Sequence, residues 1–468
     1  MPSSSSRLSR AFSLFRTAVA GTEQEFTSGS IDRAIFLLAI PMILEMVMES
    51  LFAVVDIFFV SKLGKEAVTT VGLTESIVSI IFSVGIGLAM AATAIVSRRT
   101  GEKDADGAAR SAVAAIAVAC AVSVVLAALG VFFAKDILLL MGEDPALVTE
   151  HIAYPRIVFG STPIIILLFL INGIFRGVGD ASVAMRSLWI ANGFNIVLCP
   201  LLIHGVGPWD GMGLEGAAWA TTIGRSVGVG YQFFRLRKGT GSLRILRKHW
   251  RIEIPLVSQI LKIGAGGTGQ FLINSASWIV LARIVSSFGE AAVAGYTIGI
   301  RVLVFTILPA WGISNAASTL VGQNLGAGNP ARAEKSVWRT AQFNVIFMGI
   351  VTLIYWLTAE PIVRAFSKDP EVIRYGVDTL RIVCSGYVFF AYSLVVLSSF
   401  NGAGDTRTPT MLNVCAFWLF QIPLAWLLAM ALDWGPQGVL WAIAISESCL
   451  AVAAVVIFRR GKWKTTVV

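Results

Sequence analysis

The chain has 468 residues, of which 56% are hydrophobic and only 14% are charged. A soluble protein carries about 25% charged residues, so this chain has too few charges to cover a water-facing surface. The composition therefore excludes a soluble enzyme or binding protein, and the formal net charge of +9 needs an explanation within a membrane protein.

Apolar stretches recur along the chain, and each is about as long as the roughly 20 residues that span a bilayer as a helix. In chain order they lie at about 34–60, 70–96, 111–133, 152–175, 183–204, 214–234, 256–284, 292–321, 337–358, 377–400, 409–431 and 438–458. We therefore predict an all-α integral membrane protein with twelve transmembrane helices.

The basic residues indicate an orientation. Most of the 37 Lys and Arg residues fall in the two termini and in the connections on the same side of the membrane. Because basic connections stay in the cytoplasm, we expect a multi-pass protein of the inner (plasma) membrane with both termini cytoplasmic. Anionic lipid is a sufficient partner for the basic charge, so no nucleic-acid partner is expected.

The second half of the chain repeats the first at an offset of 225 positions. Gly177, Gly179 and Asp180 return as Gly402, Gly404 and Asp405. Since each copy holds six spans, both copies lie the same way up, as parallel repeats related by a pseudo-two-fold axis along the membrane normal. Such repeats are typical of secondary transporters.

This repeat predicts the domain organisation. We expect a polar tail at 1–30, a first lobe at 31–235, a basic cytoplasmic linker at 236–255 that contacts lipid headgroups, a second lobe at 256–460 and a tail at 461–468. The two Gly-x-Gly-Asp segments follow the fourth span of each lobe. We interpret both as tight turns whose Asp caps the next helix.

Several segments resemble a known family. They are Pro41 to Asp56 followed by Phe58-Phe59-Val60-Ser61-Lys62-Leu63-Gly64, the turn Arg176-Gly177-Val178-Gly179-Asp180, and Gly322-Gln323-Asn324-Leu325-Gly326-Ala327 after the eighth span. From about residue 31 to 460 the chain resembles the MATE (multidrug and toxic compound extrusion) family of secondary efflux transporters. The resemblance implies two bundles of six helices with a cleft between them. It also implies antiport, in which H⁺ or Na⁺ enters while an organic solute leaves.

Three carboxylates lie in the first span, at Glu45, Glu49 and Asp56. At about 100° per residue they fall on one face of a helix, over a rise of about 16 Å. Because a ladder of charge facing lipid would be strongly destabilising, this face must look into protein or into a water-filled cleft. These acids either couple transport to an ion or contact substrate, or they only satisfy Arg and amide partners.

The resemblance assigns cation coupling to Asp56, and we place Glu49 and Asn195 beside it. Several family members carry Asn-x-x-x-Asp in the fifth span, but here Asn195 is followed by Cys199, so the second acid is absent. A Na⁺ site needs several oxygen ligands, whereas a proton needs one carboxyl that burial and like-charged neighbours dispose to take it up. We therefore favour H⁺ over Na⁺ and expect no cofactor.

Substrate contact is assigned to five further polar residues within the spans: Glu45, Glu75, Gln270, Asn274 and Glu447. At a local offset of 222, Glu447 corresponds to Arg225, and the two either face one another across the lobes or are paired for structure alone. Acids along a cleft favour organic, cationic drugs or metabolites, and aromatic side chains can add cation–π contacts. We expect a monomer.

The same residues bear on two rival functions. An enzyme is not expected, because the three His residues are widely separated and no catalytic or metal-ligand spacing appears. The alternative is a flippase for a lipid-linked or anionic substrate, which would need cations in its cavity. The Arg residues in or near the spans are Arg156, Arg225, Arg301 and Arg381.

Overall fold

The computed structural model describes residues 4–21, 26–207, 209–239, 243–251 and 253–466. Within them, nine long helices are continuous: α2 (Ile31–Val60), α3 (Lys65–Gly101), α4 (Ala105–Phe132), α9 (Ala181–His204), α10 (Leu214–Lys238), α11 (Ile254–Ser286), α12 (Glu290–Gly326), α13 (Pro330–Arg364) and α18 (Pro436–Arg459).

Three further helical units are broken. They are α7 (Ala153–Gly160) with α8 (Thr162–Val178), α14 (Pro370–Ser385) with α15 (Tyr387–Gly402), and α16 (Arg407–Asn413) with α17 (Ile422–Trp426). The π-helical segments Val414–Gln421 and Leu427–Ala431 continue the last unit. Each of the twelve predicted spans coincides with one of these units.

Short elements connect the long ones: α1 (Ser4–Ala20), η1 (Ser61–Leu63), α5 (Ala134–Leu140), α6 (Pro145–His151), β1 (Gly205–Val206), β2 (Trp209–Asp210), η2 (Arg247–His249) and η5 (Lys462–Thr465). The prediction of an all-α fold is confirmed apart from the antiparallel hairpin of β1 and β2, whose strands have only two residues each.

Length and apolar composition alone identify fewer spans than twelve. Among the described residues, nine helices are long and apolar enough to cross a membrane, or ten if the bent pair α14 and α15 counts as one. The two units left out are α10 and α11. Buried polar side chains lower their apolar character, because α10 carries Arg225 and Gln232 and α11 carries Gln270.

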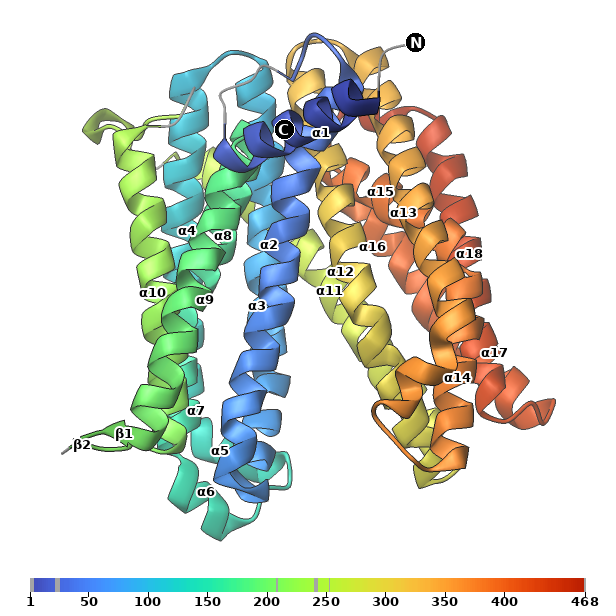
Figure 1. Ribbon diagram of the computed structural model, residues 1–468. Coiled ribbons are helices and arrows are strands. Elements are labelled where there is room, and N and C mark those ends of the chain that lie inside the picture. The colour runs from blue at the N-terminus through green and yellow to red at the C-terminus, as the bar shows by residue number, and fades with distance from the viewer. Residues whose placement is uncertain (1–3, 22–25, 208, 240–242, 252, 467–468) are drawn as a thin grey trace.

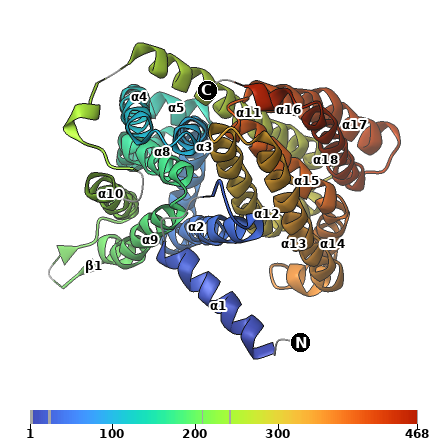
Figure 2. The same cartoon turned by 90° about the horizontal axis from the view of Figure 1, so that it is seen from above.

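The helices form two bundles, which we call the N-bundle (α2–α10) and the C-bundle (α11–α18) (Figure 2). Both termini lie at one end of the molecule, which we call the termini end, and α1 lies across it (Figure 1). The helices of the two bundles converge at this end and diverge toward the opposite end.

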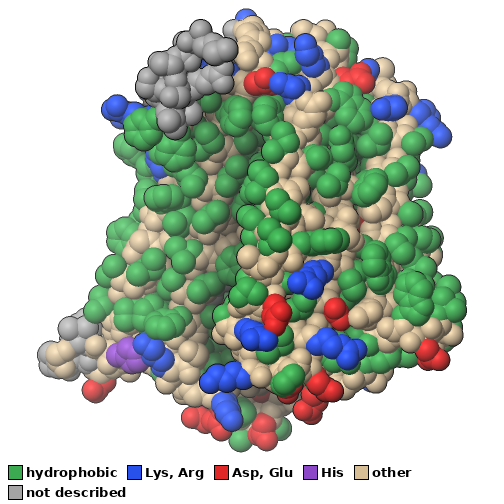
Figure 3. Space-filling model, turned by 45° about the vertical axis from the view of Figure 1, so that its right-hand side comes forward, with side chains coloured by type: hydrophobic (Ala, Val, Ile, Leu, Met, Phe, Trp, Pro, Cys, Tyr) green, Lys and Arg blue, Asp and Glu red, His purple; other side chains and the backbone are tan. Residues whose placement is uncertain are grey.

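The outer surface suits a lipid environment. Charged side chains gather mainly at the two ends, and the band between them is largely apolar (Figure 3). On α13 the exposed residues Ile346, Ile350, Leu353 and Leu357 recur every three or four positions, which places them on one helix face. A lone apolar face of this kind is stable where lipid covers it.

Glycines bring the two bundles into close contact at the termini end. A Cβ added to Gly101 of α3 would lie 1.9 Å from the carbonyl oxygen of Gln323 in α12, and one added to Gly326 would lie 2.1 Å from that of Arg98. Gln323 Nε2 also donates a hydrogen bond to the Gly177 carbonyl at 2.9 Å. The bundles are therefore sealed against each other at this end.

The two predicted Gly-x-Gly-Asp turns differ in their caps. Gly179 and Gly404 both adopt the left-handed backbone, with φ of +99° and +87°. Asp405 accepts hydrogen bonds from the backbone nitrogen and hydroxyl of Thr408, at 3.1 and 2.6 Å. Asp180 makes no cap to α9, because its carboxylate accepts instead from the Ser182 hydroxyl. The cap prediction is confirmed for Asp405 and wrong for Asp180.

The described part of the predicted linker lies against the N-bundle. Lys248 Nζ and His249 Nε2 approach the Asp106 carboxylate of α4 at 2.8 and 2.9 Å, and Arg110 lies 3.4 Å from Glu253. Some charges of the linker are thus paired with oppositely charged side chains of the N-bundle. The predicted contact with lipid headgroups and the predicted domain boundaries stay predictions.

Candidate functional site

The strongest candidate site surrounds Asp56, close to the end of α2 that lies away from the termini. Asn195 Nδ2 of α9 donates to Asp56 Oδ1 at 3.0 Å, and Thr221 Oγ1 of α10 donates to Asp56 Oδ2 at 3.1 Å. Asn195 also lies 3.1 Å from the Thr221 hydroxyl. Three helices of the N-bundle therefore meet at one carboxylate that neutral side chains hold.

Two side chains complete the surroundings of Asp56. Cys199 is buried one turn beyond Asn195 and lies close enough to Asp56 to experience its charge. Its thiol occupies the position where several family members carry a second acid. Buried Tyr154 also lies within the electrostatic reach of Asp56. The groups that hydrogen-bond to the Asp56 carboxylate are thus the neutral amide of Asn195 and the neutral hydroxyl of Thr221.

Arg225 of α10 supplies a fixed positive charge near this site. It acts electrostatically on Glu49, Asp56 and Glu75 without an ion pair within 4 Å among the described residues. Its guanidinium lies over the rings of Phe52 and Phe82, at 4.7 and 5.4 Å from their centroids. Aromatic faces attract a cation, so Arg225 is held in place without saturating any carboxylate.

Glu75 of α3 lies at the exposed edge of this group. Its side chain is exposed, and Arg301 of the C-bundle acts on it together with Arg225. Arg225 belongs to the N-bundle and Arg301 to the C-bundle. Because both act on Glu75, its side chain faces the space between the two bundles. The predicted substrate contact at Glu75 is therefore compatible with its position.

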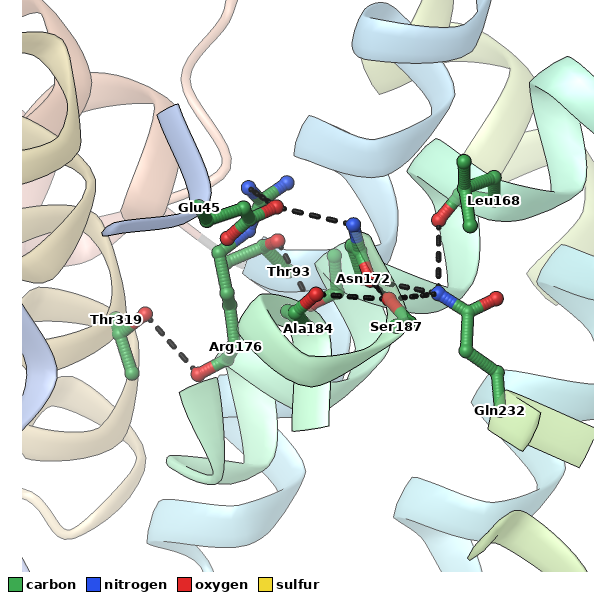
Figure 4. A network of polar contacts seen from close by, with 10 residues as sticks. Glu45, Thr93, Leu168, Asn172, Arg176, Ala184, Ser187, Gln232 and Thr319 are labelled. Atoms are coloured by element: carbon green, nitrogen blue, oxygen red, sulfur yellow. Dashed lines mark hydrogen bonds and ion pairs between the residues drawn. The ribbon is translucent and has the colours of Figure 1, made fainter. Parts of the chain in front are cut away.

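Glu45 has a different environment although it shares a helix face with Asp56. It is 1% exposed, and its Oε1 accepts from Arg176 Nη1 at 3.1 Å and from Asn172 Nδ2 at 3.0 Å (Figure 4). Asn172 Oδ1 accepts in turn from Ser187 and Gln232. A buried, ion-paired carboxylate in such a network holds α2 against α8, and this favours the structural interpretation for Glu45.

A small pocket lies between the two bundles near this ion pair. The N-bundle lines it with Met46, Met90, Thr93, Phe169 and Arg176, and the C-bundle lines it with residues that include Trp311, Asn315, Ser318 and Asn401. None of the five residues assigned to substrate contact from the sequence lines this pocket.

Gln270 and Asn274 of α11 are already bonded within the C-bundle. Gln270 exchanges hydrogen bonds with the Asn401 side chain at 3.0 and 3.1 Å and donates to the Thr406 carbonyl. Asn274 Oδ1 accepts from Trp278 Nε1 at 2.7 Å. Both residues tie neighbouring side chains together, and Gln270 is buried.

Glu447 of α18 does not face Arg225. It lines a separate pocket inside the C-bundle together with Trp278, Tyr387 and Phe390, whereas Arg225 lies on Phe52 and Phe82 in the N-bundle. Of the two alternatives considered for this pair, a contact across the lobes is therefore wrong, and so is a structural ion pair. Each residue points into its own bundle.

The two-bundle fold, the apolar outer band and a carboxylate held by three helices of one bundle are typical of a multi-pass membrane transporter. The family model MatE matches the chain twice, over residues 41–201 and 268–427. The chain therefore belongs to the MATE family, whose members are transporters and not enzymes. The two matches fall in the two bundles, as the internal repeat predicts.

Named relatives extend over almost the whole chain. It is 26% identical over 448 residues to "Probable multidrug resistance protein NorM" of Thermotoga maritima, which covers 93% of each chain. It is 24% identical over 440 residues to "FAD transporter" of Shewanella oneidensis, which covers 92% of this chain and 95% of that one.

Solved structures share the fold. "Crystal structure of MATE in complex with MaL6" matches with a TM-score of 0.88 at 24% identity and covers 94% of this chain and 99% of its own. A structure described as the outward-facing conformation of a multidrug resistance MATE family transporter also has a TM-score of 0.88 at 24% identity and covers 94% and 98%. These matches confirm the predicted fold of twelve transmembrane helices in two lobes.

Sequence reasoning missed Thr221 and the role of Arg225 as a neighbour of three acids. Both lie on α10, one turn apart, so they share a face of that helix. The signal in the sequence was that two polar residues, Thr221 and Arg225, stand four positions apart inside an apolar span. What the sequence could not reveal was that this face meets Asp56, because that depends on how α10 packs against α2.

Proposed function

We propose that this chain exports organic cations by antiport with H⁺, and that Asp56 carries the proton. The observation that supports this most directly is the carboxylate of Asp56, held by the neutral donors Asn195 and Thr221 inside an apolar bundle. A charged carboxylate without a bonded cation raises the free energy of the protein in such a place. Uptake of a proton neutralises the charge and removes this cost.

Charge balance near Asp56 favours a proton over Na⁺. The guanidinium of Arg225 already interacts electrostatically with the carboxylates of Glu49, Asp56 and Glu75. A Na⁺ ion bound beside them would therefore be repelled by this guanidinium. Na⁺ must also exchange its water for several oxygen ligands, whereas a proton needs only one carboxyl oxygen. Cys199 in place of a second acid removes a ligand that a Na⁺ site would use.

One observation favours Na⁺ as the second candidate. Asn195 Oδ1 is buried and has no hydrogen-bond partner within the described structure. Together with the two Asp56 oxygens and the Thr221 hydroxyl, it would give a Na⁺ ion a small set of oxygen ligands. Coupling to Na⁺ is therefore the alternative that an experiment must separate from coupling to H⁺.

An acidic side chain that faces the space between the bundles supports the proposed substrate class. Glu75, which is exposed toward that space, would attract an organic cation, and the pocket between Met46, Phe169 and Trp311 offers an apolar surface for its body. Proton uptake would weaken the attraction and release the cation. Exchange of one proton for one monovalent cation moves no net charge, so the pH difference drives it, and each pH unit, worth about 1.4 kcal/mol, supports a tenfold gradient.

Alternating access would proceed by a rocking of the N-bundle against the C-bundle. With both termini in the cytoplasm, the sealed termini end lies inside the cell and the diverging end opens outward. In the next step of the cycle the glycine contacts at Gly101 and Gly326 would have to separate. We take the plasma membrane as the location and a monomer as the working form.

The test is ethidium transport in everted membrane vesicles that carry the protein, with an imposed proton gradient and with or without Na⁺. We expect Na⁺-independent uptake that is lost in Asp56→Asn and retained in Glu66→Gln, which changes an exposed acid at the start of α3. Transport that requires Na⁺ would establish the second candidate. Transport of FAD or a lipid-linked anion, with none of any cation, would contradict the proposed substrate class.

A further inference from the structure

A cavity of about 680 Å³ lies where α13 meets α14, at the end of the C-bundle away from the termini. Sites that bind small molecules usually measure about 300–1,000 Å³, so this cavity has room for one. Its charged lining residues are Glu360 and Arg364 of α13, Lys368 of the following connection, and Arg374 and Asp378 of α14. Side chains of both signs gather at this end of the molecule (Figure 3).

Two of the three cations in this lining have no anionic partner. Arg364 Nη2 lies 2.5 Å from Glu360 Oε1, so these two charges neutralise each other. Neither Lys368 nor Arg374 forms an ion pair within 4 Å among the described residues, and the guanidinium of Arg374 lies over the Tyr375 ring, 5.4 Å from its centroid. The cavity therefore keeps two positive charges that can meet an anion.

The second acid of the lining has a neutral partner. Asp378 Oδ2 accepts a hydrogen bond from Gln437 Nε2 of α18 at 2.8 Å, which holds the carboxylate in place without neutralising it. In the part of the chain that the structure describes, no cationic nitrogen lies within 4 Å of Asp378. The cavity thus combines two unpaired cations with one unpaired carboxylate.

An apolar stripe on α13 leads from the lipid-facing band to this cavity. Ile350, Leu353 and Leu357 are exposed along it. Arg364 follows Leu357 by seven residues, which returns it to within about 20° of the same direction on the helix. A molecule that lies along this stripe and fills the cavity therefore needs an apolar body and a charged end.

Exposed aromatic side chains mark the level of the membrane interface beside the cavity. Trp356 is 53% exposed and Phe366 is 66% exposed, and Trp356 Nε1 donates to the Arg381 carbonyl of α14 at 3.2 Å. Tryptophan is enriched where the hydrocarbon meets the headgroups. Glu360 and Arg364 lie about 6–12 Å further along α13, so the cavity stands at the level of the headgroups.

We propose that this cavity binds the headgroup of a zwitterionic phospholipid that carries a primary amine. Its phosphate lies between Lys368 and Arg374, its ammonium group lies beside Asp378, and its acyl chains lie along the stripe of α13. Lys and Arg donate charge-assisted hydrogen bonds to phosphate, and a primary ammonium has N–H groups that a carboxylate can accept. Binding at this site does not depend on which ion or solute the protein moves.

The test is native mass spectrometry of the full-length protein, delipidated in detergent and titrated with lipids that share the same dioleoyl chains. We expect phosphatidylethanolamine to bind several-fold more tightly than phosphatidylglycerol or phosphatidylcholine. In the double variant Lys368→Gln/Arg374→Gln its affinity should fall about tenfold or more, because charge-assisted contacts with the phosphate are lost. The matched control Lys65→Gln/Lys135→Gln changes exposed cations of the N-bundle and should bind as the wild type does.

Asp378→Asn tests the ammonium contact separately. The new amide oxygen can still accept from Gln437, so the fold is kept while the negative charge is lost. We expect this variant to bind phosphatidylethanolamine and phosphatidylglycerol equally. Thermal unfolding midpoints identify any variant that fails to fold, and if this one does, the double variant of Lys368 and Arg374, both exposed, decides.

Three results would overturn the proposal: equal affinities of the wild type for the three lipids, an unchanged affinity in Lys368→Gln/Arg374→Gln, or a preference for phosphatidylethanolamine that persists in a folded Asp378→Asn protein. Soluble glycerophosphoethanolamine, which has the headgroup without the chains, separates a lipid from a free phosphate ester. It should not displace the lipid at equal concentration, and displacement would show that the cavity takes the soluble ester instead.

Discussion

The hydrogen-bond partners of the carboxylates on α2 separate structural from functional acids. Glu45 and Asp56 lie on one face of α2, yet Glu45 is bound by the charged Arg176 and Asp56 by the neutral Asn195 and Thr221. An ion-paired carboxylate is already neutralised, whereas one with neutral donors can still exchange a proton. This difference assigns Glu45 to the scaffold and Asp56 to coupling.

The scaffold role of Glu45 predicts a large loss of stability in Arg176→Met. That change leaves a buried carboxylate without its cation, which costs about 3–5 kcal/mol, and the thermal unfolding midpoint in detergent should fall accordingly. Arg364→Met removes the cation of an exposed pair with Glu360, where about 0–1 kcal/mol is expected. Equal midpoints for the two variants would contradict the structural role.

The thiol beside Asp56 predicts that the coupling ion can be changed. Cys199→Asp places a second carboxylate next to Asp56, which adds the oxygen ligand that a Na⁺ site lacks. We expect ethidium transport by this variant to rise on addition of Na⁺, whereas the wild type and Cys199→Ser stay insensitive. A Cys199→Asp protein that transports without any response to Na⁺ would show that ligand number does not set ion choice here.

At the scale of elements, glycines decide where helices of the two bundles touch. Gly101 lies against Gln323, and an added Cβ would approach the Gln323 carbonyl oxygen to 1.9 Å. Atoms at that distance overlap, so Gly101→Ala must push α3 away from α12. Gly349 of α13 has no other heavy atom within 4 Å of the corresponding position and provides a matched control.

We therefore predict that Gly101→Ala opens the termini end. The measurement is maleimide labelling of Ser97→Cys in a background without the native cysteines, because Ser97 is fully buried against Gly322 at the contact between the bundles. Labelling should be slow in the parent and in Gly349→Ala, and several-fold faster in Gly101→Ala. Identical labelling rates would mean that this contact does not hold the bundles together.

The elements also show what sequence reasoning can reach. The ranges of the long helices follow from apolar runs, and the shared face of Glu45, Glu49 and Asp56 follows from helical periodicity. The break at Gly386 and the π-helical turns in 414–431 left no comparable pattern. They depend on packing between helices, as do the contact of Thr221 with Asp56 and the separation of Glu447 from Arg225.

At the scale of the whole molecule, the repeat gives two similar bundles with different chemistry. The N-bundle holds Asp56, Glu49 and Arg225, whereas the corresponding region of the C-bundle holds Leu281 and Glu447 among aromatic rings. The two-fold plan was readable from the sequence, because glycine turns and apolar spans recur at one offset. The assignment of ion coupling to the N-bundle rests on side chains that do not recur.

The most direct test of proton coupling at Asp56 is the ion flux that an ethidium gradient drives in proteoliposomes. Internal pH and ²²Na⁺ content are recorded together for the wild type and Asp56→Asn. We predict ethidium-driven proton movement without ²²Na⁺ movement in the wild type, and neither in Asp56→Asn. Movement of ²²Na⁺ with ethidium, or proton movement that persists in a folded Asp56→Asn protein, would contradict proton coupling at this residue.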